Sequence, residues 1–100
     1  MASETVSQKI KLPAPRHDGK VSVEKAMQLR RSIRSYQPKQ ISMNNNSQLL
    51  WAAQGKTNPR GYRTTPSAGA LYPLEVFFFA FDVTGLKEGV YQYFPNEHAI

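Results

Sequence analysis

Three arginines and one serine gather within five consecutive residues, Arg30-Arg31-Ser32-Ile33-Arg34. An arginine side chain presents a planar set of donors that can bond a phosphate in a bidentate manner, and a serine hydroxyl adds a neutral donor. Charge-assisted hydrogen bonds are stronger than neutral ones, so one phosphate could occupy several of these donors at once. The pattern indicates an anion-binding segment.

Two other interpretations of this arginine cluster stay open from spacing alone. Basic residues at the end of a helix are favoured by the negative end of the helix macrodipole, in which case the side chains simply remain solvated. Tyr36 and Tyr62 could also stack on bases while the arginines contact a nucleic-acid backbone. No recognisable nucleic-acid-binding motif accompanies them, so this interpretation depends on charge alone.

A run of small residues bracketed by two prolines extends from Thr65 to Pro73. Pro66 and Ser67 can begin a short helix with Ser67 as its cap, and Gly69 between two alanines leaves main-chain groups accessible to a flat ligand. A plain structural turn before the next strand explains the run equally well.

The remaining chemistry-bearing residues predict neither a catalytic side chain nor a metal site. Glu75, Tyr91 and Tyr93 gain no acid or base role from position alone, because such a role requires a perturbed environment. His17 and His98 lack metal-ligand spacing. The absence of cysteine excludes disulfides, thiolate zinc sites and cysteine nucleophiles.

Length and charge restrict the class of protein. The chain has 100 residues and a formal net charge of +6, which favours anionic partners such as nucleic acid, phosphorylated cofactors or acidic surfaces. Its longest apolar run, Val76 to Phe81, is far below the roughly 20 residues that a membrane span needs. We expect one small soluble domain in the cytoplasm, with a marginal core that a partner chain would stabilise.

An arm and two helices are expected before the first strand. Residues 1–20 carry two prolines, several charges and no apolar period, which predicts an extended arm outside the core. Ser22 is a plausible N-cap for a helix that runs to about Arg31. Ser42 begins a clearer second helix that ends at Gly55.

Two strands follow the helices. The nearly continuous apolar run from Leu74 to Val83 predicts a central strand that is covered on both faces. A turn leads to a second strand at 90–94, and another turn precedes Ala99-Ile100, where a third strand would begin. Two helices and one hairpin are too little to cover a central strand, so the chain looks like half of a domain.

Three ordered sequence blocks resemble the FMN-dependent nitroreductase superfamily. The blocks are RRSIRSY at 30–36, QLLWAAQG at 48–55 and PSAGALYPLE at 66–75. Within the superfamily the chain is similar to the SagB-type dehydrogenases, which include azoline-oxidising enzymes of ribosomal peptide maturation. The segment 89–93, followed by Pro95 and His98, matches the hairpin of that branch. The resemblance covers residues from about 12 to 100.

The resemblance implies an α+β fold in which helices wrap an antiparallel sheet, present here as an incomplete, N-terminal portion. Residues 1–20 would be an extended N-terminal arm, and residues 21–100 the N-terminal half of a nitroreductase-like FMN-binding domain. The family works as an intertwined homodimer with FMN at the interface, and transfers hydride through flavin N5, azoline-type dehydrogenation included. The substrate, whether a small molecule or a peptide, and the electron donor stay open.

Eight residues match cofactor-binding positions of the family: Arg30, Arg31, Ser32, Arg34, Pro66, Ser67, Ala68 and Gly69. The resemblance implies that Arg30 and Ser32, with Arg31 beside them, contact the FMN phosphate and ribityl chain. It places Arg34 near the pyrimidine end of the ring, where a fixed cation would stabilise the negative charge of the reduced flavin. Residues 66–69 match the segment that lines the flavin from the other subunit.

The chain also departs from the family pattern. Ala70 stands where many nitroreductases have Asn, and Leu71-Tyr72 replaces a polar pair. These departures put reduction of nitro compounds in doubt but keep FMN, because the SagB-like branch has the same residues. Family members are considerably longer, so the alternative is a truncated, non-catalytic fragment that lacks the C-terminal half of the site. Whether this chain is itself an enzyme stays open.

Overall fold

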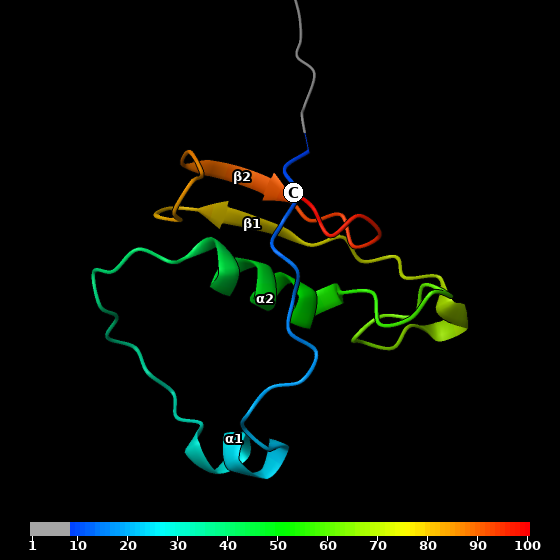
Figure 1. The fold of residues 1–100 in the computed structure, drawn as a ribbon, viewed down its shortest axis with the longest axis horizontal. Coiled ribbons are helices and arrows are strands. Elements are labelled where there is room, and N and C mark those ends of the chain that lie inside the picture. Colours follow the sequence, from blue (N-terminus) through cyan, green and yellow to red (C-terminus); the bar gives the residue numbers. More distant parts are fainter. Residues whose placement is uncertain (1–8) are drawn as a thin grey trace, which may run out of the picture.

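The computed structural model describes residues 9–100 and shows an α+β arrangement, as predicted (Figure 1). Its elements in chain order are α1 (Val23–Leu29), α2 (Met43–Gln54), the 3-10 helix η1 (Ala68–Ala70), β1 (Phe77–Ala80) and β2 (Gly89–Gln92). The β1–β2 hairpin and α2 form the body, whereas α1 lies apart from it at the end of a long loop. No helix of the described chain is long and apolar enough to cross a membrane.

Helix α2 begins and ends where the sequence predicts. The Ser42 hydroxyl accepts a hydrogen bond from the backbone N–H of Asn45 at 3.1 Å, and Gly55 is the C-cap, with φ −66° and ψ 150°. Gly55 is therefore not required for a left-handed conformation. A Cβ at this position would instead collide with the Trp51 ring and carbonyl.

The hairpin covers α2 with one of its two faces. β1 and β2 pair antiparallel with Phe78 opposite Tyr91, and these two rings stack with centroids 5.4 Å apart. Phe78 packs against the core, but Phe77 and Phe79 are 58% and 57% exposed. The prediction of a strand covered on both faces is therefore wrong for the described chain. Successive strand side chains point to opposite faces, and only one face of β1 has a neighbour.

The N-terminal segment from residue 9 onward is part of the core. Ile10 and Ile100 exchange two backbone hydrogen bonds of 2.6 and 2.9 Å, and the Leu12 N–H donates to the His98 carbonyl at 3.1 Å. This pairing leaves Leu12 only 3% exposed, in one cluster with Leu50 and Tyr93. The expectation that residues 1–20 lie outside the core is therefore wrong for Leu12. Residues 1–8 of this predicted arm lie outside the described residues.

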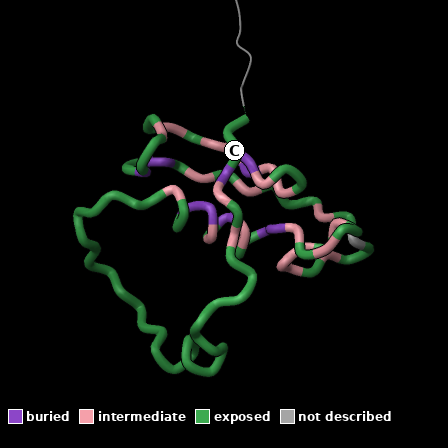
Figure 2. Tube along the Cα trace, in the orientation of Figure 1, coloured by how far each residue is buried: buried purple, intermediate pink, exposed green. Residues whose placement is uncertain are grey.

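Every residue from 16 to 42 is exposed (Figure 2). The Ser22 hydroxyl caps α1 through the N–H of Lys25 at 3.0 Å, but the helix ends at Leu29, one turn or less before the predicted end. None of its residues is buried, and Val23, Met27 and Leu29 leave most of their apolar surface in water. A helix this short is not stable on its own, so α1 requires a surface that the rest of the described chain does not supply.

We predict that Gly55→Ala lowers the free energy of unfolding by about 1–3 kcal/mol, because the added methyl group forces Trp51 or the end of α2 to move. Chemical denaturation followed by circular dichroism measures the change. Gly19→Ala is the matched control, since a Cβ there meets nothing within 4 Å, and its effect should stay within about 0.5 kcal/mol. Equal stabilities of the two variants would contradict the close-contact explanation.

Candidate functional site

The predicted anion-binding residues lie on the extended segment that follows α1. Arg30 is the C-cap of the helix, and its guanidinium donates to the Ser32 hydroxyl at 3.5 Å. The Arg31 guanidinium donates to the carbonyls of Gln28 and Arg30 at 2.9 and 2.8 Å, although α1 ends before it at Leu29. Arg34 is exposed like the other three.

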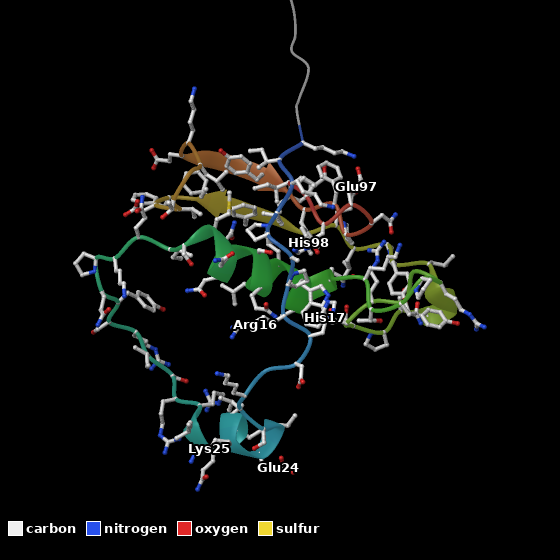
Figure 3. The ribbon with its side chains drawn as sticks, viewed as in Figure 1. Arg16, His17, Glu24, Lys25, Glu97 and His98 are labelled. Carbon is white, nitrogen blue, oxygen red and sulfur yellow. The ribbon has the colours of Figure 1, made fainter. Side chains whose placement is uncertain are left out.

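No carboxylate neutralises this cluster within the described part of the chain. The one ion pair found among residues 9–100 joins Lys9 to Glu97, at the opposite end of the molecule. Side chains on the loop, such as Glu24 and Lys25 of α1, point outward (Figure 3). The arginines therefore present unpaired positive charge on an accessible segment.

The small-residue segment forms a second, separate surface. Pro66, Ala68 and Gly69 are exposed, and Gly69 has a φ of +65°, which glycine adopts without strain. Ser67 stands at the N-cap of η1, but its hydroxyl accepts the backbone N–H of Tyr72 at 2.9 Å and makes no cap bond. The predicted capping role of Ser67 is wrong, because the tight turn to Tyr72 uses the same oxygen.

The structure does not bring these two surfaces together within one chain. α1 and the arginine segment lie at the end of the long loop, while η1 lies on the far side of the body (Figure 1). Any ligand that contacts both segments must therefore lie between this chain and another surface that carries one of them.

A recess beside the small-residue segment contains a residue that sequence reasoning missed. It has a volume of about 150 Å³, and its lining residues are Gln54, Pro66, Ser67, Tyr72, Pro73 and Leu74. Gln54 is the last residue of α2 and only 9% exposed. Its side-chain nitrogen donates to the Thr65 hydroxyl at 2.6 Å, whereas its Oε1 is buried without a partner among residues 9–100. In the sequence, Gln54 belongs to the QLLWAAQG block at 48–55, but no role was assigned to it there.

A second polar cluster joins the N-terminal segment, α2 and the C-terminal turn. His98 Nδ1 lies 2.8 Å from the Tyr93 hydroxyl, and Nε2 lies 2.7 Å from the Ser47 hydroxyl and 3.0 Å from the Pro13 carbonyl. One neutral tautomer satisfies this chain: the Tyr93 hydroxyl donates to Nδ1, Nε2–H donates to Ser47, and Ser47 donates to Pro13. Ser47 and Tyr93 are 1% and 2% exposed, and their hydrogen bonds join three segments of the chain, so the cluster has a structural role.

Burial determines the protonation of this cluster. Desolvation lowers the pKa of His98 below its usual value; Lys11 and His17 act in the same direction, and the hydrogen bond to Pro13 opposes them. Burial also raises the pKa of Tyr93 to about 12, against a smaller opposing effect of Arg63. Both groups are therefore neutral near pH 7. No group of three metal-ligating side chains gathers within residues 9–100.

Comparison with known proteins gives two matches. The sequence profile of the Nitroreductase family matches residues 27–95, a range that contains all eight predicted cofactor-binding residues. A Methanocaldococcus jannaschii protein named as a putative nitroreductase is 44% identical over 80 residues, which are 80% of this chain and 40% of that protein. The chain thus spans about two fifths of the length of the curated relative that it matches.

We predict that the free energy of unfolding falls as the pH decreases from 7.5 to 5.5. The unfolded chain, with an ordinary histidine pKa near 6.5, binds a proton that folded His98 resists. The dependence should disappear in His98→Gln and persist in His17→Gln, because His17 makes the smallest of the contributions that lower the pKa of His98. Denaturant titrations at several pH values measure it, with an upper limit of about 1.4 kcal/mol per pH unit for one proton. An unchanged slope in His98→Gln would show that other groups cause the dependence.

Proposed function

The chain belongs to the nitroreductase family, and from this premise we propose that it supplies FMN-binding residues to an oxidoreductase of the SagB-type dehydrogenase branch. One observation carries the proposal: an exposed, uncompensated arginine cluster and an exposed small-residue segment lie on separate parts of one chain. The first has the chemistry to hold a phosphate and the second to lie against a flat ring.

The residues present fit both ends of FMN. Arg30, Arg31 and Ser32 together offer charged and neutral donors to a phosphate. At the other segment, exposed Pro66, Ala68 and Gly69 allow main chain to approach a ring closely, and the recess beside them contains a buried acceptor without a partner. These features favour a ligand with a phosphate at one end and a planar, hydrogen-bonding group at the other.

A second copy of the chain is the partner that we propose for the exposed loop. Helix α1 is seven residues long, buries none of them and exposes three large apolar side chains. If the loop packs against a second copy, these side chains become buried, and the arginine segment of one protomer approaches the 66–69 segment of the other. The homodimer therefore provides both the missing contact surface and the missing half of the ligand site.

Bound FMN supplies hydride transfer at N5 of its ring. This chain's residues then have three tasks: the arginine segment binds the phosphate, the small residues orient the ring and exclude water from it, and Arg34 stabilises negative charge at the pyrimidine end. Loss of Arg34 should reduce turnover more than phosphate binding, because the charge that it meets develops during the reaction. The substrate, a small molecule or a peptide, is not determined by these residues.

The proposal is tested by purifying the chain with excess FMN, removing free ligand on a sizing column, and recording the visible spectrum and mass of the eluted species. A yellow dimer with flavin absorption bands is the expected result. A colourless product would contradict FMN binding by this chain and favour the alternative, a truncated and non-catalytic fragment.

We further predict that Arg30→Ala weakens FMN binding by about 1.5–3 kcal/mol, the range for a hydrogen bond to a charged group. Stability should not change, because the only bond of this side chain within the described residues is a 3.5 Å contact with Ser32. Arg60→Ala removes the same charge from an exposed loop outside both segments and should leave the affinity unchanged. Flavin fluorescence titration measures the FMN affinity of both variants. Equal losses of affinity would show that net charge, and not the position of Arg30, causes the effect.

A further inference from the structure

We propose that Gln54 is a recognition residue of the FMN site, whose side-chain oxygen accepts a hydrogen bond from the N–H on the pyrimidine edge of the isoalloxazine ring. The proposal rests on the proposed function, since it assumes that FMN lies against the 66–69 segment. Its starting point is Gln54 Oε1, a side-chain acceptor that is buried without a partner. Such an atom is costly to leave unsatisfied, so a partner from outside the described chain is expected.

The orientation of the Gln54 amide follows from its neighbour. The Thr65 hydroxyl donates toward the Ala53 carbonyl at 3.5 Å, so the same oxygen is left to accept from Gln54. In this structure the amide nitrogen faces Thr65 and donates to its hydroxyl at 2.6 Å. The carbonyl oxygen is consequently the end of the amide that lacks a partner.

None of the other residues that line the recess donates a hydrogen bond to the Gln54 oxygen in the described chain. Pro66 and Pro73 have no backbone N–H, and the side chain of Leu74 is apolar. The Ser67 hydroxyl accepts the N–H of Tyr72 and makes no hydrogen bond with Gln54. Gln54 thus lines the recess with a side-chain oxygen that has no hydrogen-bond donor among the described residues.

The electrostatics of the recess suit the carbonyl groups that flank such an N–H. The guanidinium of Arg63 lies 4.8 Å from the centre of the Tyr72 ring, which forms one wall, and brings positive charge to this side of the segment. The oxidised isoalloxazine ring carries one N–H, at N3, between two carbonyls. The Gln54 oxygen would accept from this N–H, and the positive charge of Arg63 would attract the carbonyl oxygens beside it.

The recess is continuous with the surface on which the ring is proposed to lie. Pro66 and Ser67 belong both to the lining of the recess and to the segment that resembles the flavin-lining segment of the family. Its volume of about 150 Å³ admits the edge of one ring rather than the whole three-ring system. Gln54 would thus read the end of the flavin, while residues 66–69 lie against its face.

The test compares FMN with 3-methyl-FMN, in which a methyl group replaces the N3 hydrogen. We expect the full chain to bind FMN about ten-fold more tightly, the loss expected for one unsatisfied hydrogen bond. In Gln54→Ala both the acceptor and the obstruction to the methyl group are removed, so the two ligands should bind within about two-fold of each other. The affinities come from flavin fluorescence titration and require no turnover.

Gln48→Ala is the matched control, because Gln48 lies on the same helix but bonds the backbone of Arg16 instead. It should retain the ten-fold preference. Thr65→Val frees the Gln54 amide to rotate and should reduce the preference for FMN over 3-methyl-FMN. Thr65→Ser keeps the hydroxyl and should keep the preference. These two variants distinguish a recognition role from a general loss of stability, which would affect both ligands equally.

The outcomes separate this inference from the proposed function. Binding of FMN without preference over 3-methyl-FMN in the unmodified chain overturns the role of Gln54 and leaves the proposed function standing. A preference that survives in Gln54→Ala overturns it as well, because another residue must then exclude the methyl group. Absence of FMN binding overturns the proposed function, and the inference with it. If Gln54→Ala does not fold, the Thr65 variants decide: a preference that Thr65→Val leaves at its full size overturns the role of Gln54.

Discussion

The hydrogen-bond chain through His98 is the constraint on which the body of the molecule depends. It joins the carbonyl of Pro13, the Ser47 side chain in the middle of α2 and Tyr93 after β2. These three segments lie far apart in the sequence. All of its polar atoms are satisfied only with a neutral imidazole. The same region holds the buried apolar cluster of Leu12, Leu50, Tyr93 and Ile100. Polar and apolar contacts therefore stabilise one small core rather than two.

This core fixes α2, and α2 in turn positions the candidate recess. The last turn of the helix carries Gln54, and the Gly55 carbonyl accepts the N–H of Thr64 at 2.9 Å. Close packing of Gly55 against Trp51 keeps the helix end and the following loop near each other. These contacts with the end of α2 thus hold the 64–72 segment in position, although most of its own residues are half-buried or exposed.

Local signals predicted the elements, and non-local contacts decided what they bury. A capping serine and a terminal glycine were enough to predict α2, and alternating turn and apolar segments were enough for the hairpin. The burial of Leu12 could not be predicted, because it follows from pairing with residues 98–100 at the other end of the sequence. The exposed faces of Phe77 and Phe79 were missed because an apolar run shows that a strand can be buried, not which residues cover it. Gln54 was missed because an unsatisfied buried atom becomes apparent only in the folded structure.

The separation of the two candidate segments is a consequence of how little core this chain has. A body that consists of α2 and one hairpin can hold the 64–72 segment against a helix end, but it offers no surface to the loop that carries the arginines. A phosphate site on that loop has no rigid support from the same chain, and support is what gives a binding site its geometry. If a second copy covers α1, the surface that buries Val23, Met27 and Leu29 also fixes the arginines in space. Assembly and cofactor binding would then be coupled, each favouring the conformation that the other needs.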